Sequence, residues 1–184
     1  MIIGIDEVGR GCWAGPLVAG AVRLRSPING LRDSKQLIAS HRSTFAKLIH
    51  EHADVGLGWV SAHEVDTLGL SKAVETAMRR ALVRMSIGSD QIIIDGNYNY
   101  LPDVMNVKTV VKADQTVPAV SAASIVAKVA RDAYMKNVAK NYPHYGFDTH
   151  VGYGTSKHRA ALQAHGPVVS EHRFSFKPLK AFML

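Results

Sequence analysis

The sequence begins with Met1-Ile2-Ile3-Gly4-Ile5-Asp6-Glu7-Val8-Gly9-Arg10-Gly11, an apolar run that leads into two adjacent carboxylates and a Gly-Arg-Gly turn. Two neighbouring like charges raise each other's pKa unless a positive charge lies close by. Hard divalent cations such as Mg²⁺ bind carboxylate oxygens and supply that charge. The turn offers backbone N–H groups and a guanidinium to an anion. The stretch fits either an ordinary acidic turn or a metal site that acts on phosphate.

A second apolar run ends in the same way, because Gln91-Ile92-Ile93-Ile94 leads directly into Asp95 and Gly96. The run predicts a buried strand with a carboxylate at its C-terminal end. Apolar patterns predict further strands over residues 1–5, 17–24, 55–61 and 104–111, and helices over 40–52, 61–85, 118–140 and 157–165. Ser40 is the expected N-cap of the first helix, and Ser61 with Glu64 forms a capping box for the second. This order predicts an α/β layered fold with a mixed sheet.

The two acidic strand ends predict a shared site. Ligands of open α/β sheets lie beyond the carboxyl ends of the strands. If the two strands are parallel neighbours, Asp6, Glu7 and Asp95 meet at one edge. A partly buried charge there needs a partner or a metal ion. The alternative is a set of independent acids in separate turns.

The predicted helix over residues 118–140 is mostly apolar but carries one narrow polar stripe. At about 100° per residue, Ser121, Ser124, Lys128 and Arg131 fall within a stripe about 80° wide. Asp114 would extend the stripe if the helical phase reached back to it. Such a stripe suits the binding of a phosphate backbone. A solvent-facing side of an amphipathic helix is the alternative.

A length of 184 residues favours a single domain over residues 1–184. The net charge of +7 and the pI of about 9.6 favour a polyanion as its binding partner. The one cysteine, Cys12, excludes an internal disulfide and fits a reducing cytosol. No histidine base lies near it in sequence, so we expect a buried spectator rather than a catalytic thiol. No leader and no apolar run of about 18 residues is present, so we expect no membrane association.

Two further segments carry groups that suit such a site. Gly152-Tyr153-Gly154-Thr155 places an aromatic ring, which can stack on a sugar or a base, between two glycines. Asp33-Ser34-Lys35-Gln36-Leu37 places a lysine among residues typical of turns. Each segment taken alone also fits an ordinary turn.

Together these motifs resemble bacterial ribonuclease HII, the type 2 ribonuclease H, over nearly the whole chain. The resemblance rests on Gly-Ile-Asp-Glu-Val-Gly-Arg-Gly at 4–11, Ala-Gly-Pro-Leu-Val at 14–18, Asp-Ser-Lys-Gln-Leu at 33–37, Ile-Asp-Gly-Asn at 94–97, Lys-Ala-Asp at 112–114, Ser-Ala-Ala-Ser-Ile-Val-Ala-Lys-Val-Ala-Arg-Asp at 121–132, Gly-Tyr-Gly-Thr at 152–155 and His-Arg-Phe-Ser-Phe at 172–176. So many ordered motifs are highly specific.

The resemblance implies a ribonuclease H-like fold, with a central mixed five-stranded sheet flanked by helices and a helical C-terminal segment. It also implies a catalytic site of four carboxylates that hold two Mg²⁺ or Mn²⁺ ions, namely Asp6, Glu7, Asp95 and Asp114. Gly9, Arg10 and Gly11 would read a 2′-hydroxyl, and Tyr153 would stack on the deoxyribose beyond the cut. The phosphate-holding positions would be Lys35, Ser121, Ser124, Lys128 and Arg131.

The activity implied by the resemblance is hydrolysis of the RNA strand of RNA/DNA hybrids, and cutting 5′ to ribonucleotides embedded in duplex DNA. We expect these nucleic acids as partners of a cytoplasmic monomer, with no protein partner. The sibling type, ribonuclease HIII, usually has an extra N-terminal domain, which we do not expect here because the catalytic strand begins at residue 1. Two rival hypotheses are an exonuclease or resolvase of the same fold, and a non-enzymatic hybrid-binding module.

Overall fold

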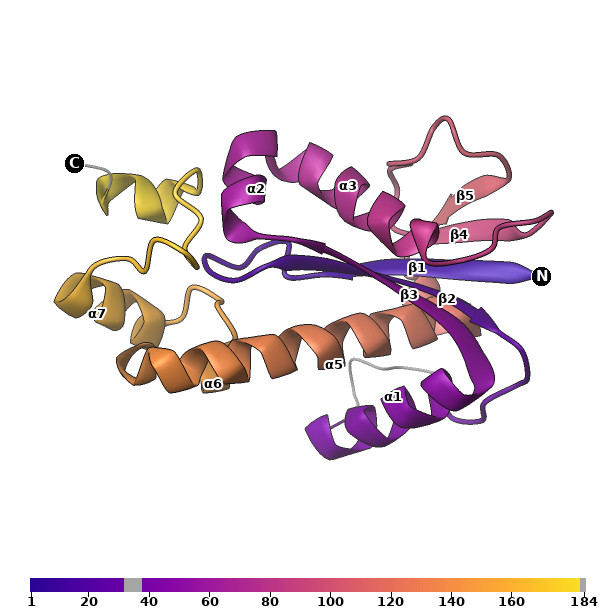
Figure 1. The fold of residues 1–184 in the computed structure, drawn as a ribbon, viewed down its shortest axis with the longest axis horizontal. Coiled ribbons are helices and arrows are strands. Elements are labelled where there is room, and N and C mark those ends of the chain that lie inside the picture. The colour runs from indigo at the N-terminus through magenta and orange to yellow at the C-terminus, as the bar shows by residue number, and fades with distance from the viewer. Residues whose placement is uncertain (32–37, 183–184) are drawn as a thin grey trace.

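The computed structural model describes residues 1–31 and 38–182, and Lys35 lies outside them. Its central feature is a five-stranded sheet in the order β3-β2-β1-β4-β5 (Figure 1). Strand β1 is antiparallel to β2 and parallel to β4, so the sheet is mixed, as predicted. The strands are β1 (Ile2–Val8), β2 (Leu17–Leu24), β3 (Ala53–Val60), β4 (Gln91–Asp95) and β5 (Val107–Val110).

Helices cover both faces of the sheet. On one face lie α2 (Ala62–Leu68) and α3 (Leu70–Val83), and on the other lie α1 (Ala39–His52) and the long α5 (Pro118–Asn141), as Figure 1 shows. The short α4 (Ala113–Thr116) precedes α5. The remaining elements are η1 (Pro143–Tyr145), α6 (Phe147–His150), α7 (Ser156–His165) and η2 (Lys177–Phe182).

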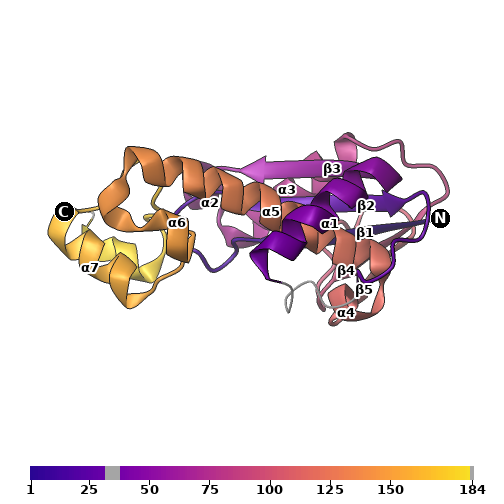
Figure 2. The ribbon, with the colours of Figure 1, turned by 90° about the horizontal axis from the view of Figure 1, so that it is seen from below.

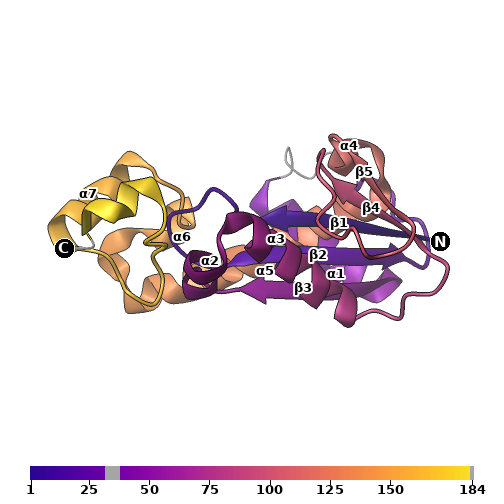
Figure 3. The same cartoon turned by 90° about the horizontal axis from the view of Figure 1, so that it is seen from above.

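The C-terminal elements gather at the end of the molecule opposite the N-terminus (Figures 2 and 3). There the last turns of α5 join α6 and α7 around a hydrophobic cluster that includes Met135, Phe147 and Leu162. This cluster is separate from the cores on the two faces of the sheet. Among the described helices, none has both the length and the apolar character needed to cross a membrane.

The alternation of side chains along β1 decides which residues face the site. Ile3 and Ile5 point into the core beneath α3. Gly4 points the other way, where a Cβ atom would lie 2.2 Å from the backbone of Ala119 and Val120. A side chain at this position would therefore push α5 off the sheet. Asp6 follows Gly4 by two residues, so its side chain lies on the same face of the sheet, the one covered by α5.

Several predicted element boundaries were wrong. β1 continues to Val8, because β2 pairs with it as far as the Val8–Val18 register, so the acid pair lies inside a strand. Helix α1 begins at Ala39 after an extended Ile38, so Ser40 is not its N-cap. β5 is shorter than residues 104–111. The predicted 61–85 helix is divided at Gly69, although the capping box at its start is confirmed.

Candidate metal centre and nucleic-acid interface

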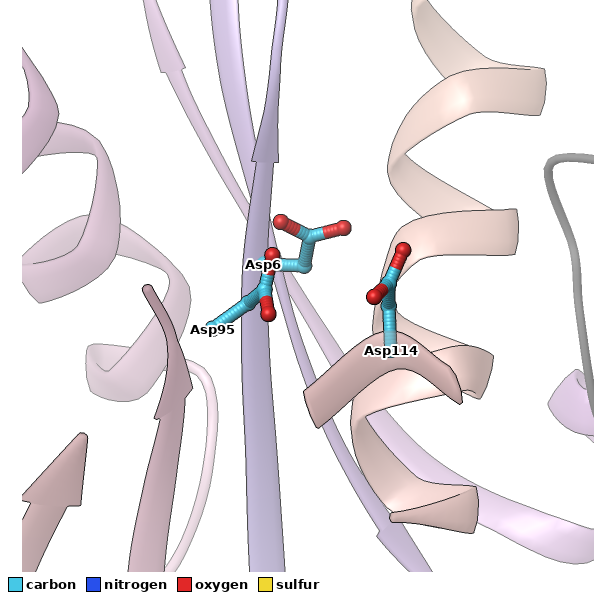
Figure 4. A group of neighbouring side chains, drawn as sticks. All are labelled: Asp6, Asp95 and Asp114. Atoms are coloured by element: carbon cyan, nitrogen blue, oxygen red, sulfur yellow. The ribbon is translucent and has the colours of Figure 1, made fainter. Parts of the chain in front are cut away.

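The parallel pairing of β1 with β4 brings two acids together. Ile5 pairs with Ile94, so the next residues, Asp6 and Asp95, lie side by side, with Asp95 at the end of β4 and Asp6 two residues before the end of β1. Asp114 approaches from α4, as Figure 4 shows. One carboxylate oxygen from each of the three lies within 4.8 Å of the others. We call Asp6, Asp95 and Asp114 the acid cluster.

Backbone contacts hold Asp114 against the sheet. The Ala113 N–H donates to Asp95 Oδ1 at 2.7 Å, and the Ser121 hydroxyl donates to the backbone carbonyl of Asp114. Lys112 takes a left-handed conformation with φ 57°, which turns the chain from β5 into α4. Asp114 therefore belongs to a separate short helix, and its position does not continue the helical phase of α5.

The acid cluster has the properties of a divalent-cation site. Asp6 is 6% exposed and Asp114 is 2% exposed, so these are not surface acids. Three carboxylates this close repel each other, and burial increases the cost of their charge. A hard divalent cation with oxygen ligands, such as Mg²⁺ or Mn²⁺, offsets both effects. The donor set and its spacing thus fit the ions expected from the sequence.

Glu7 lies next to the acid cluster but outside it. Because side chains alternate along a strand, Glu7 points to the opposite face from Asp6. It still lines the same cavity and forms an ion pair with Arg10 at 3.5 Å. Burial raises the pKa of Glu7, Arg10 lowers it, and nearby Asp95 raises it again. Its role as a fourth metal ligand stays a prediction.

Two members of the acid cluster, Asp6 and Asp95, border a cavity of about 480 Å³ that is also lined by predicted recognition residues. Asp6, Asp95 and Tyr153 lie on its wall together with the Gly-Arg-Gly loop (residues 9–11). These groups are far apart in sequence, and only the fold brings them together. The full set is Asp6, Glu7, Val8, Gly9, Arg10, Gly11, Arg42, Asp95, Ser124, Ile125, Lys128 and Tyr153.

The predicted polar stripe of α5 divides into two pairs. Ser124 and Lys128 line the cavity, and Lys128 also pairs with Asp132 at 2.8 Å. Ser121 and Arg131 are buried at 1% and 0% exposure. The stripe is therefore not one continuous surface that faces a ligand.

Arg131 is a support for loops in this structure. Its guanidinium donates to the carbonyls of Pro16 and Val151, both at 2.8 Å, and of Ala14 at 3.1 Å. These bonds use the guanidinium N–H donors that would otherwise be available to a phosphate. Its predicted phosphate contact thus has no geometric support here.

The Gly-Arg-Gly loop is held in a defined conformation. Gly9 has φ 86°, and a Cβ atom there would lie 2.3 Å from Arg131 Nε. Glycine is therefore required at this position for both conformation and space. The side chain of Arg10 is about half exposed, so its guanidinium is accessible from the cavity.

Tyr153 and Cys12 lie close together but differ in exposure. Tyr153 is 43% exposed and lines the cavity, where its ring is accessible. Cys12 is fully buried, and burial raises the pKa of its thiol. A buried thiol with a raised pKa is a poor nucleophile, which agrees with the expected spectator role.

Sequence reasoning missed residues that contribute to the site. Arg42 reaches the cavity from the first turn of α1. The apolar spacing of the predicted helix gave no indication of a role for Arg42. Its position just after the Asp33–Leu37 segment was a usable signal. Arg173 was also missed as a support of the Gly-Arg-Gly loop, because its contacts are with residues more than 150 positions away.

The family model for ribonuclease HII matches residues 3–179 of this chain. The chain belongs to the ribonuclease HII family. The ribonuclease HII of Nitrosococcus oceani is 47% identical over 185 residues, which cover 99% of this chain and 91% of that protein. The resemblance expected from the sequence is thus confirmed, and with it the character of the protein as an endonuclease that hydrolyses phosphodiesters.

Solved structures agree with the ribonuclease HII fold. The ribonuclease HII in a PCNA complex from Archaeoglobus fulgidus superimposes with a TM-score of 0.80 at 26% identity, covering 96% of this chain and 95% of that one. A Bst ribonuclease HIII in complex with Mn²⁺ gives a TM-score of 0.75 at 21% identity and covers 97% and 68% of the two chains. The second likeness supports the fold alone.

Proposed function

We propose that this ribonuclease HII is a two-metal enzyme that hydrolyses the RNA strand of RNA/DNA hybrids and cuts 5′ to ribonucleotides embedded in duplex DNA. One observation carries the proposal. Asp6 and Asp95 of the acid cluster line a single cavity with the Gly-Arg-Gly loop and Tyr153, so the proposed metal-binding and sugar-reading groups would face the same ligand. Products would carry 5′-phosphate and 3′-hydroxyl ends.

The acid cluster and Glu7 would hold two ions of Mg²⁺ or Mn²⁺. When bound, such ions lower the pKa of an attacking water and stabilise the departing 3′ oxygen. Asp6 is the best candidate for a shared ligand, because it lies on the central strand between Asp95 and Asp114. The oxygen-only ligands of the acid cluster support this choice of ions.

The Gly-Arg-Gly loop would distinguish RNA from DNA. A 2′-hydroxyl both donates and accepts hydrogen bonds, and it is the group by which a protein separates the two sugars. Glycines at positions 9 and 11 let the backbone approach the ribose, while Arg10 lies beside Glu7 at the edge of the metal centre. Recognition and chemistry would thus share one nucleotide.

Tyr153 would supply the requirement for a junction between RNA and DNA. Its exposed ring can stack on the deoxyribose after the cut, where an extra hydroxyl would crowd it. Ser124, Lys128 and Arg42 are the polar groups from helices on the same cavity wall that would hold phosphates. The net charge of +7 favours association with such a polyanion.

The decisive experiment is cleavage of an end-labelled DNA duplex that contains one ribonucleotide, with Mg²⁺ and with chelator. We expect a single metal-dependent cut on the 5′ side of the ribonucleotide. Cutting of a long RNA/DNA hybrid without cutting of this duplex would refute the proposed junction recognition. A ladder of stepwise shortened products would indicate an exonuclease instead.

Variants of Tyr153 test the junction role directly. Tyr153→Ala removes the ring, so cleavage at a single embedded ribonucleotide should fall by roughly a hundredfold, since stacking on a base or sugar contributes about 1–3 kcal/mol. Tyr153→Phe is the matched control, because it keeps the ring and loses only the hydroxyl. Equal rates for Tyr153→Ala and the wild type would exclude the role.

The proposal also places this activity in a cytoplasmic monomer. The buried thiol of Cys12 is compatible with a reducing compartment. Light scattering of the active enzyme, free and with hybrid, should give one chain per complex.

A further inference from the structure

The His172-Arg173 dipeptide belongs to a motif for which the proposed function gives no role. Both side chains are buried, at 1% and 0% exposure. The backbone of the dipeptide is attached to the segment after the Gly-Arg-Gly loop. His172 forms a β-bridge with Ala14, and the Arg173 N–H donates to the Trp13 carbonyl at 2.8 Å.

Arg173 holds the Gly-Arg-Gly loop from inside the protein. Its Nη1 donates to the carbonyls of Gly9 at 2.7 Å and Arg10 at 3.2 Å. Its Nε and Nη2 both donate to the Gly15 carbonyl, at 3.0 and 2.8 Å. A planar guanidinium with several fixed donors thus joins the Gly-Arg-Gly loop to Gly15, which a lysine could not do in the same way.

His172 begins a chain of hydrogen bonds that runs toward Tyr153. His172 Nδ1 lies 2.8 Å from the Val168 N–H and 3.1 Å from the Val168 carbonyl oxygen. Because the shorter contact is with the N–H, which can only donate, we assign a lone pair to Nδ1 and the ring proton to Nε2. That Nε2 faces His158 Nε2 at 3.0 Å. His172 is therefore the donor of this bond, and His158 is the acceptor.

The contact between His158 and Tyr153, at the other end of this series of hydrogen bonds, independently gives the same donor and acceptor roles. His158 Nδ1 lies 2.9 Å from the Tyr153 carbonyl, which can only accept, so the ring proton of His158 lies on Nδ1. Its Nε2 must then accept, as the His172 side requires. The ring of His150 stacks on that of His158, with centroids 4.5 Å apart, and its Nδ1 accepts from the Gly152 N–H at 3.2 Å.

The hydrogen bonds hold only when all three rings are neutral. A proton added to His158 would place two N–H donors opposite each other at its contact with His172, and a proton added to His172 Nδ1 would face the Val168 N–H. Burial lowers the pKa of His158 and of His172 to about 4, so both rings are neutral at physiological pH. These hydrogen bonds, from His172 through His158, therefore hold the Tyr153 backbone in place at physiological pH.

We propose that His172 and Arg173 are positioning residues that set the distance between the Gly-Arg-Gly loop and Tyr153, with His158 as the relay. Arg173 fixes the loop that would read the ribose, and its neighbour His172 fixes, through His158, the residue that would contact the next deoxyribose. Displacement of one element relative to the other would weaken recognition of the junction more than the chemistry. This inference rests on the proposed function.

The tautomers give a test on the unmodified protein. Long-range ¹H–¹⁵N NMR of the histidine rings should show His158 as the Nδ1–H tautomer and His150 and His172 as Nε2–H tautomers. At pH 5.5 the rings of His158 and His172 should still be neutral. His158 as the Nε2–H tautomer, or protonated at that pH, would overturn the proposed relay.

Kinetics of paired variants test the functional consequence. His172→Leu removes the donor, while His172→Gln keeps an N–H at nearly the place of Nε2. Relative to a long RNA/DNA hybrid, cleavage at a single embedded ribonucleotide should fall roughly five- to tenfold in His172→Leu, mainly through KM, and recover in His172→Gln. His63→Leu, at an exposed position of α2, is the control and should leave the ratio unchanged.

The outcomes separate this inference from the proposed function. If Tyr153→Ala leaves the substrate ratio unchanged, the junction role itself fails. If Tyr153→Ala lowers the ratio and a folded His172→Leu does not, only the positioning role fails. A purely structural histidine would lower both activities in parallel, without rescue of the ratio by glutamine.

Discussion

The two ends of the central sheet both carry buried acids, and they differ in how these charges are accommodated. At the N-terminal end of β4, Asp90 and Asp54 bind the same guanidinium, since Arg23 contacts them at 3.0 and 2.6 Å. At the C-terminal ends of β1 and β4, three aspartates bring their oxygens within 4.8 Å of one another. One end neutralises its acids with a cation of the protein, and the other collects like charge.

The pKa shifts at the two ends have opposite directions. Burial would raise the pKa of Asp90, but the Gly88 N–H, the N-terminal ammonium and Arg23 together lower it. For Glu7, burial raises the pKa and the Arg10 ion pair only partly offsets this. The charge of Asp90 thus stabilises the fold, whereas the charge of Glu7 costs free energy. This difference separates a structural acid from one arranged for a ligand.

The largest expected effect comes from Asp6→Asn. Loss of one carboxylate from the metal centre removes several kcal/mol of transition-state stabilisation, so turnover should fall by at least about a thousandfold. Hybrid binding should be largely retained, and stability without metal should not decrease, because one repelling charge is gone. Steady-state kinetics, hybrid binding and thermal melting measure the three quantities. Near-normal turnover of Asp6→Asn in Mg²⁺ would contradict the assignment of a metal centre to this end of the sheet. Asp90→Asn, at the other end, is the control and should retain full turnover.

The second effect is a loss of folding stability at low pH, which arises from the buried His158 and His172. The folded-state pKa of about 4 for His158 and His172 lies below the usual 6.5, so the unfolded chain binds protons first. Stability should therefore fall as the pH drops from about 6.5 to about 4, by an amount on the order of several kcal/mol from this pair. Urea unfolding at each pH measures it. His172→Gln should lose less over this range, and equal slopes would contradict the assignment.

Removal of the cation at the structural end should give a moderate effect on stability alone. Arg23→Met leaves Asp54 and Asp90 without their shared guanidinium, so the free energy of unfolding should fall by about 1–3 kcal/mol. Turnover of the folded enzyme should not change. Arg25→Met, at an exposed partner of Asp54, is the control and should cost less than about 1 kcal/mol. Urea unfolding and steady-state kinetics together decide the outcome.

The smallest effect is the response of stability to Mg²⁺. Binding to the folded state should raise the melting temperature, with a gain of about 1.4 kcal/mol at a tenfold excess over the dissociation constant. The gain should disappear in Asp6→Asn and persist in Asp90→Asn. An equal gain in both variants would place the ion away from the acid cluster.

Much of the site was predictable because its signals are local. An apolar run followed by an acid identifies a strand end, and two such runs predicted that Asp6 and Asp95 meet, which the β1–β4 register confirms. The polar stripe of α5 shows the limit of this reasoning. Helical phase placed Ser121 and Arg131 beside Ser124 and Lys128, but the structure buries the first two. Phase says which residues share a side of a helix, and it does not say what covers that side.

The sequence by itself determined the family, the alternating core of the sheet and the acids at its edge, because each depends on residues close together or on motifs in a fixed order. Only the tertiary structure decided that Arg131 supports loops and that His172 reaches Tyr153 through His158. These outcomes depend on which distant segments pack together. A buried donor bonds to whichever acceptor the fold brings within reach, and the sequence order does not specify that acceptor.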